Sequence, residues 1–303
     1  MKNAGNQLIG FIIILQMVSL FSGCKTKTTV NQENSFSFVF MTDIHLQPER
    51  NAVQGFSQAI DSINKLNPDF VITGGDLIMD ALKQSYGRAD SLYNLYLETS
   101  KKIKKPVHNG MGNHDIYGIL KQSKAESSHP EYGEKMFEKR IGKSYYDFDY
   151  KGWKFIVINS IEDTRKNSYI GLIDNTQIEW LKGVIAETDP KMPIVLSTHI
   201  PFITAYTQKY SGSTFPNDSS RVIANAKDVI DLFKGYNLKL VLQGHLHTVE
   251  DVYIDGVHFI TGGSIAGAWW TGAERGYEEG FLQVFVNGQN FTWRYVDYGW
   301  KVE

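Results

Sequence analysis

The chain has 303 residues, a formal net charge of −2 and an aromatic content of 13%. This length allows one large domain or two small ones, with enough residues for a sizeable core. The aromatic content excludes a disordered chain, and the balanced charge offers no basic face for a nucleic-acid polymer. Nothing in the composition indicates an obligate protein partner.

The first feature along the chain is a mostly apolar run over residues 8–21. Its length suits the core of a signal peptide and is too short to span a bilayer comfortably. Two small residues follow, and then Cys24, the only cysteine of the chain. The arrangement resembles a bacterial lipoprotein signal, which implies cleavage before Cys24 and attachment of lipid to its sulfur. An ordinary signal peptide, or a short anchor with an incidental cysteine, is the alternative, because Phe21 stands where leucine is usual.

These features predict a signal peptide over residues 1–23 and a polar, flexible tether over 24–35. The remaining residues, 36–303, are expected to form the functional domain. With a single cysteine the chain forms no intrachain disulfide. A protein tethered in this way is expected in the bacterial cell envelope, held to the membrane by its N-terminal lipid and facing the periplasm or the exterior.

From Phe36 onward, short β-branched or aromatic runs alternate with amphipathic segments, which predicts an α/β fold. Residues 36–42 are nearly all apolar, as expected for a strand covered on both faces. Four apolar residues between 53 and 63 then recur at helical spacing. Further strands are predicted over 70–73, 107–110, 153–159, 194–198, 238–243 and 257–261, and further helices over 176–187, capped by Asn175 or Thr176, and over about 221–234. A hairpin around Asn287-Gly288 is predicted within 280–296.

Side chains of the kinds that bind metals follow five of these strands. They are Asp43 and His45 after the first strand, Asp76 after the second, Asn113, His114 and Asp115 after the third, His199 after 194–198, and His245 and His247 after 238–243. The carboxyl ends of parallel strands share one edge of a sheet, where α/β proteins bind ligands. We therefore expect these side chains to converge on one site.

Each of these residues taken alone has a simpler interpretation. A lone aspartate after a strand usually forms a turn or caps a helix, and a lone histidine is more often structural than a ligand. The distribution of the histidines argues for a site, because five of the eight in the chain lie at these strand ends. The other three, His108, His129 and His258, are interpreted as structural or exposed.

Carboxylate, imidazole and amide donors together suit divalent transition metals, and manganese, iron and zinc all accept them. The set contains no thiolate, which excludes a closed structural zinc site built on cysteines. It is too large for one ion and about right for two ions bridged by a carboxylate. Two such ions can clamp a phosphoryl group and generate hydroxide at neutral pH. The sequence thus predicts two divalent ions as cofactors.

The motifs TDIH, GGD, GNHD, THIP and GHLH occur in this order along the chain. Together they resemble the five signature blocks of calcineurin-like metallophosphoesterases, and the resemblance extends over residues 36–296. It implies a four-layer α/β/β/α sandwich, in which two mixed β-sheets pack together and helices flank them on the outside.

The resemblance also implies a role for each motif residue. Asp43, His45 and His247 would hold the first ion, Asn113, His199 and His245 would hold the second, and Asp76 would bridge them. A hydroxide between the ions would attack phosphorus, and His114 would assist the leaving group without binding metal. Asp115 would orient the His114 ring; a simple turn or cap role is the alternative for Asp115.

Departures from other branches of the family narrow the substrate. Ala81 and Leu82 follow Asp80 where protein phosphatases have Arg-Gly, and Met79 stands where purple acid phosphatases have a tyrosine ligand. His45 in the first block is shared with the cyclic-nucleotide phosphodiesterase branch and related ones. We therefore expect hydrolysis of a small-molecule or envelope phosphodiester. A phosphate-scavenging monoester phosphatase and a non-catalytic binding lipoprotein on the same fold are the alternatives.

Two segments are candidates for the substrate pocket. Residues 201–218, which include Tyr206, form a long polar and aromatic stretch that suits a lid or groove wall. Trp269 and Trp270 follow the strand after GHLH and are candidates for stacking on a base or sugar, or for covering an alkyl chain. Packing of one or both tryptophans on the sheet is the alternative.

Overall fold

The computed structural model describes residues 34–302. The predicted signal peptide and nearly all of the predicted tether lie outside these described residues. The first strand begins at Ser35, one residue before the predicted start of the domain. Within residues 34–302, none of the helices has the length and apolar character needed to cross a bilayer.

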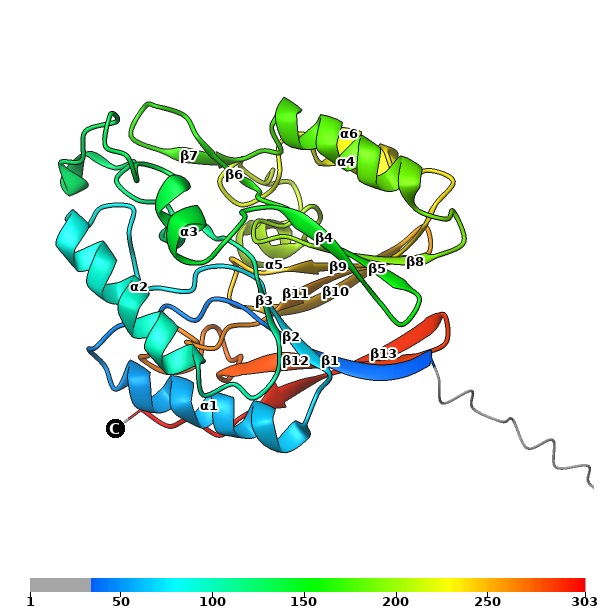
Figure 1. Ribbon diagram of the computed structural model, residues 1–303, viewed down its shortest axis with the longest axis horizontal. Helices are drawn as coiled ribbons and strands as arrows, with labels where there is room; N and C mark the ends of the chain where they lie inside the picture. The colour runs from blue at the N-terminus through cyan, green and yellow to red at the C-terminus, as the bar shows by residue number, and fades with distance from the viewer. Residues whose placement is uncertain (1–33, 303) are drawn as a thin grey trace, which may run out of the picture. The chain divides into compact units, whose positions relative to one another are not determined.

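Two mixed β-sheets form the centre of the fold (Figure 1). The first has the strand order β13-β12-β1-β2-β3, with β1 (Ser35–Met41), β2 (Phe70–Thr73), β3 (Val107–Asn109), β12 (Gly280–Asn287) and β13 (Asn290–Asp297). The second has the order β10-β11-β9-β8-β5-β4, with β4 (Tyr146–Tyr150), β5 (Trp153–Val157), β8 (Pro193–Ser197), β9 (Asn237–Gln243), β10 (Val249–Ile254) and β11 (Val257–Gly262). A small separate pair consists of β6 (Ile161–Asp163) and β7 (Tyr169–Gly171).

Each sheet contains a set of adjacent parallel strands. In the first sheet β1, β2 and β3 are parallel, and in the second sheet β5, β8, β9 and β11 are parallel. Antiparallel strands β12, β13, β10 and β4 lie toward the edges. The carboxyl ends of the parallel strands in each sheet therefore share an edge, as the strand-end pattern of the sequence requires.

Strand β1 is buried on both faces, which explains its almost uninterrupted apolar sequence. Phe38 faces the second sheet: it stacks on Phe70 of the neighbouring strand β2 at 5.2 Å between ring centroids, and it meets Phe155 of β5 in the second sheet edge-on at 5.5 Å. Val39 and Met41 alternate with it and pack into the other core cluster, which contains the apolar face of the first long helix. The sheets are thus held together by an aromatic layer, and helices cover their outer faces.

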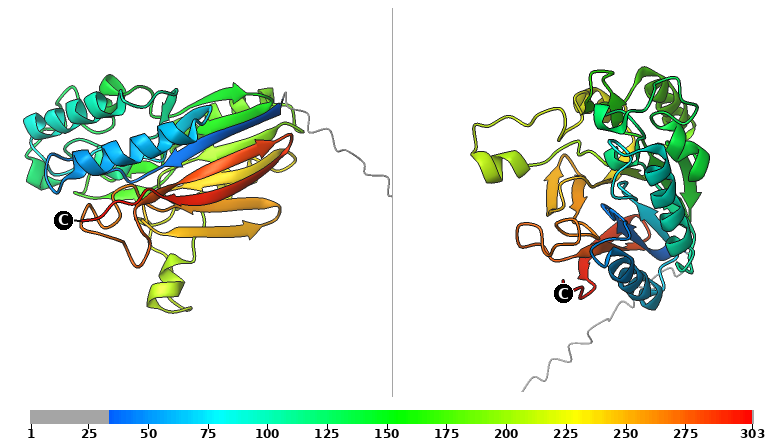
Figure 2. Two further views of the ribbon diagram at one scale, coloured as in Figure 1. Left: turned by 90° about the horizontal axis from the view of Figure 1, so that it is seen from below. Right: turned by 90° about the vertical axis from the view of Figure 1, so that its left-hand side faces the viewer.

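Helices α1 (Ala52–Leu66) and α2 (Tyr86–Ser100) lie outside the first sheet, and α4 (Asn175–Glu187) and α6 (Ala226–Asp231) lie outside the second (Figure 1). The predicted sandwich of two mixed sheets flanked by helices is confirmed. Shorter helices are α3 (Lys135–Arg140), α5 (Tyr206–Ser211) and the 3₁₀ turns η2 (Asn113–Asp115) and η3 (Lys121–Ser123). Figure 2 shows the segment with α5 projecting away from the sheets.

Two predicted helix boundaries are wrong. The cap of α4 is Asp174, whose side chain accepts a hydrogen bond from the backbone N–H of Gln177. The predicted helix over 221–234 is helical only within α6, because the residues before it pair with β7. The Asn225 amide exchanges two hydrogen bonds with the backbone of Ile173, and Ile223 forms a bridge with Gly171.

Candidate metal centre

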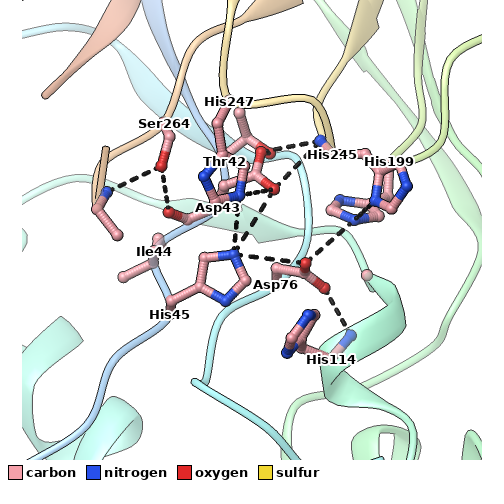
Figure 3. Close-up of polar contacts among 12 residues, drawn as sticks. Thr42, Asp43, Ile44, His45, Asp76, His114, His199, His245, His247 and Ser264 are labelled. Carbon is pink, nitrogen blue, oxygen red and sulfur yellow. Dashed lines mark hydrogen bonds and ion pairs between the residues drawn. The ribbon is translucent and has the colours of Figure 1, made fainter. Parts of the chain in front are cut away.

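The side chains predicted to bind metal converge where strands of both sheets end (Figure 3). Two sets of three have donor atoms that all lie within 4.8 Å of one another. We call Asp43, His45 and His247 the first ligand group, and Asp76, His199 and His245 the second ligand group. Asn113 stands beside the second group, since its Oδ1 lies 3.0 Å from Nε2 of His199.

The first ligand group directs three electron-pair donors at one point. His247 donates its Nδ1–H to the carbonyl of Gly267 at 2.6 Å, so its Nε2 is left to accept. That Nε2 lies 3.2 Å from Oδ1 of Asp43 and 3.0 Å from Nε2 of His45. Both Asp43 and His45 are fully buried. Acceptors this close repel one another unless a proton or a cation lies between them.

The second ligand group repeats this arrangement. His199 donates its Nδ1–H to the carbonyl of Gly74 at 2.7 Å and points Nε2 at the centre. Nε2 lies 3.3 Å from Oδ2 of Asp76, and Nδ1 of His245 lies 3.3 Å from the same Nε2. In both groups a backbone carbonyl orients an imidazole, which is how proteins usually fix metal-binding histidines.

The pKa values of the three histidines His199, His247 and His245 reflect the buried charges around them. Burial opposes a charge on His199, but the Asp76 carboxylate outweighs it and raises the pKa of His199 to about 9. Burial likewise opposes a charge on His247, whose pKa is nevertheless raised by Asp43. Burial and then the charge of His199 lower the pKa of His245 to about 4. Divalent cations would supply the same compensation, so the donor set fits them.

Asp76 lies between the two groups. Its Oδ2 is 3.3 Å from Nε2 of His199 and 3.6 Å from Nε2 of His45, which belong to different groups. Its Oδ1 accepts the backbone N–H of His114 at 2.7 Å. Although burial favours the neutral acid, the charges of His199 and His114 hold the pKa of Asp76 well below its usual range. A carboxylate in this position can bridge two ions.

The backbone is strained at most of these ligands. Asp43, His45, Asp76, His245 and His247 all have φ between 44° and 72°, in the left-handed region that residues other than glycine seldom occupy. Such residues cost roughly 1–3 kcal/mol each and persist only where the surroundings fix them. Here hydrogen bonds between strand ends do so: the Asp43 N–H donates to Gly75 O, and the His45 N–H donates to Asp76 O.

Asp115 does not orient the ring of His114, which corrects the predicted role. Its carboxylate accepts the backbone N–H groups of Gly112, Leu77 and Ile78 and so ties the GNHD turn to the loop after β2. The His114 ring is instead held by the Met79 carbonyl, to which Nδ1 donates at 2.6 Å. These contacts fit the alternative role of Asp115, that of a turn residue.

Because Nδ1 is bonded to the Met79 carbonyl, Nε2 is the ring nitrogen of His114 that is left for other partners. The His114 and His45 rings meet edge-on with centroids 4.7 Å apart. His45, Asp76 and His114 also form a third set whose donor atoms lie within 4.8 Å of one another. His114 therefore lies within reach of a molecule bound at the ligand groups.

Ser264 is a residue of the site that the sequence analysis missed. Its Oγ donates to the carbonyl of Asp43 at 2.9 Å and accepts the N–H of Ala266 at 3.0 Å (Figure 3). Thr42 adds a second support, because its Oγ1 donates to Oδ2 of Asp43 at 2.7 Å. Ser264 comes one residue after Gly262, the last residue of β11, so it also lies at a strand end, but its hydroxyl is not among the metal-binding side-chain types that define the pattern.

The two predicted substrate tryptophans have opposite environments. Trp270 is buried, and its Nε1 donates to the carbonyls of Ile44 and His45, so it packs within the fold and supports the ligand loop. Trp269 is 38% exposed, and its ring centroid lies 4.7 Å from that of His247. Tyr206 is half-buried and lines the same cavity as Trp269.

The three remaining histidines lie outside the ligand groups, as predicted. His108 stacks on Phe148 at 3.7 Å between centroids, and His129 packs against the ring of Tyr86. His258 places Nδ1 2.9 Å from a carboxylate oxygen of Asp251 on the neighbouring strand. Their contacts are structural.

Comparison with known sequences gives a family match and a curated relative. The sequence pattern of the calcineurin-like phosphoesterase family matches residues 36–249. A protein of Xenorhabdus bovienii (strain SS-2004) that bears the name probable cyclic nucleotide phosphodiesterase is 22% identical over 222 residues. That alignment covers 69% of this chain and 78% of the relative.

Solved structures share the fold at low sequence identity. GAP50, the anchor in the inner membrane complex of Plasmodium, superposes with a TM-score of 0.54 at 15% identity, over 89% of this chain and 86% of that one. The phosphopantetheinyl hydrolase of Mycobacterium tuberculosis superposes with a TM-score of 0.50 at 14% identity, over 77% of this chain and 91% of that one. At such identities the likeness concerns the fold alone.

Proposed function

The chain belongs to the calcineurin-like phosphoesterase family, and from this premise we propose that it hydrolyses a phosphodiester with the help of two divalent metal ions. The family and the ligand groups support a metal-dependent phosphoesterase. The use of two ions and the preference for a diester are the further steps of the proposal. The observation that carries the two-ion step is the position of Asp76, whose carboxylate lies within 3.6 Å of a histidine of each ligand group.

In this proposal the first ligand group would hold one ion, His199, His245 and Asn113 would hold the other, and Asp76 would contribute its carboxylate to both. Two divalent ions would polarise a phosphoryl group and activate water as the nucleophile. Manganese, iron and zinc all suit these donors. The buried carboxylates and the strained loops keep the donors in place before any ion or substrate binds.

His114 would assist departure of the leaving group. Its Nδ1–H is bonded to the carbonyl of Met79, so proton exchange would occur at Nε2. The imidazolium form would donate the Nε2 proton to the departing oxygen and keep the Nδ1 bond to Met79. Such general acid catalysis typically contributes about 10²–10⁴-fold.

The diester preference is supported by two features. His45 completes the first ligand group, as in the phosphodiester-cleaving branches that the sequence resembles. The name of the Xenorhabdus relative points to the same reaction class.

A comparison of two substrates tests the proposal. The manganese-loaded protein should cleave bis-p-nitrophenyl phosphate with a higher kcat/KM than p-nitrophenyl phosphate, and a chelator should abolish both reactions. Elemental analysis of the same sample should give close to two ions per chain. Faster cleavage of the monoester would contradict the diester preference, and one ion per chain in an active sample would contradict the two-ion mechanism.

We also propose that the protein is anchored in the bacterial cell envelope through lipid on Cys24. The support is the sequence alone: an apolar run over residues 8–21 that ends in small residues and the single cysteine. The anchored protein would then lie close to substrates in the envelope. Incorporation of labelled palmitate should occur in the natural chain and disappear in Cys24→Ser; equal labelling of both would contradict the anchor.

A further inference from the structure

A small cavity opens beside the first ligand group. It encloses about 130 Å³ and is lined by His245 and His247 together with Tyr206, Arg221, Trp269 and Glu274. Pockets for whole small molecules enclose about 300–1,000 Å³, so this one has room for a single chemical group. Because two of its walls are metal ligands, the group that enters it would be attached directly to a phosphoryl group at the ions.

Trp269 is fixed in this cavity without being buried. Its φ of 53° is rare for a bulky side chain. Two contacts hold the backbone on its C-terminal side: Arg50 donates to the Trp269 carbonyl at 2.9 Å, and the next residue, Trp270, is anchored in the core. The indole stands over His247 and remains 38% exposed. An unfavourable backbone that presents an aromatic face to solvent beside a reactive centre indicates a binding role.

Tyr206 is the second aromatic wall and is held just as firmly. Its hydroxyl accepts a hydrogen bond from Nε of Arg275 at 3.0 Å, and its backbone N–H donates to Oγ1 of Thr204 at 2.9 Å. Thr204 is in turn bonded to the carboxylate of Glu250 at 2.6 Å. The ring therefore keeps its position although it begins the projecting helix α5.

We propose that this cavity binds a planar ring carried by an ester group of the substrate. Flat rings gain from contact with aromatic faces, both by stacking and by burial of apolar area. Arg221 and Glu274 add a donor and an acceptor to the lining of the cavity, which suits a ring with polar edges better than a lipid chain. The inference rests on the proposed function, because it concerns the group attached to the phosphoryl.

Binding measurements on the manganese-loaded full chain can test this directly. The probes are inorganic phosphate, phenylphosphonate and cyclohexylphosphonate, titrated by calorimetry. Phenyl and cyclohexyl rings are similar in size, but only the phenyl ring is flat. A cavity that binds rings by hydrophobic burial alone would favour cyclohexylphosphonate. Stacking on an aromatic side chain is worth on the order of tenfold in affinity, so phenylphosphonate should bind about tenfold more tightly than cyclohexylphosphonate.

Substitution of Trp269 then locates the effect. Trp269→Leu should lose the preference for phenylphosphonate over cyclohexylphosphonate, which is on the order of tenfold, and its affinity for inorganic phosphate should be unchanged. Trp269→Phe should keep most of the preference for phenylphosphonate. Phe285→Leu is the matched control, because Phe285 is a 39% exposed aromatic on β12 that does not line the cavity. It should bind all three probes like the unaltered protein.

The outcomes separate this inference from the proposed function. If phosphate binds in a metal-dependent way but the two ring probes bind equally, the ring site is wrong and the metal centre stands. If Trp269→Leu weakens phosphate and phenylphosphonate by the same factor, Trp269 only supports His247, and the ring site is again wrong. If phosphate does not bind to the metal-loaded protein at all, it is the proposed function that fails.

Discussion

The two ligand groups and the cavity beside them are adjacent but differently constructed. Asp43, His45 and Asp76 are buried and are held by backbone groups of neighbouring strand ends. Trp269 and Tyr206 are partly exposed and are held by the side chains of arginines outside the sheets. The fold itself therefore determines the chemistry of the centre, whereas a few surface contacts determine what fits beside it. Changes at the centre should abolish binding of metal or turnover, and changes at the cavity wall should alter selectivity.

The most severe test of this difference is Asp76→Ala, which removes the one carboxylate shared by both groups. Loss of residues that merely support metal ligands typically costs about 10–100-fold in metal affinity, so loss of the bridging ligand should exceed that range. We expect little bound metal and no measurable hydrolysis, with the secondary structure retained. Elemental analysis and circular dichroism would check this. Two bound ions in the variant would show that Asp76 is not a bridge.

His114→Ala should separate metal binding from turnover. His114 is not in either ligand group, so both ions should remain, while the rate on a diester with a poor leaving group should fall by about 10²–10⁴-fold. The rate of hydrolysis of a p-nitrophenyl ester should fall much less, because its leaving group needs no proton. Full activity on the poor leaving group, measured at saturating substrate, would contradict the acid role.

Removal of metal should reveal how far the centre depends on cations for stability. A ligand present at 100 times its dissociation constant stabilises a protein by about 2.7 kcal/mol. For a domain of this size each kcal/mol shifts Tm by about 2–4 °C. A chelator should therefore lower Tm by at least several degrees, and added manganese should restore it. An unchanged Tm would mean that the carboxylates and histidines are compensated without metal.

The convergence of the candidate ligands was predictable from sequence because most of them follow strands that are buried on both faces, although β3, which precedes Asn113, is only half-buried. Such runs have a clear end, and the residue types after them are chemically specific. The role of Asp115 was not predictable, since its carboxylate bonds to the backbone of Leu77 and Ile78, a contact between loops that no local pattern records. Helix α2 also escaped detection, because its buried face contains the tyrosines Tyr93 and Tyr96 as well as apolar residues.

The neighbouring tryptophans show a further limit of sequence patterns. Trp269 and Trp270 are identical residues side by side, and only one can point into the core. Gly55 in α1 decides which, because a Cβ there would collide with the Trp270 ring. Since this glycine lies far away in the sequence, the exposed position of Trp269 required the three-dimensional structure.

The smallest expected effect completes the comparison. Tyr206→Phe keeps the ring and removes only the hydroxyl that accepts the Arg275 hydrogen bond. A hydrogen bond of this kind contributes about 0.5–1.5 kcal/mol, so KM for a ring-bearing diester should rise a few-fold. Because Tyr206 touches neither ligand group's supporting backbone, kcat on the same substrate and the metal content should not change. A fall in kcat without a rise in KM would mean that the cavity wall and the metal centre form one rigid unit, and that the separation between chemistry and selectivity does not hold.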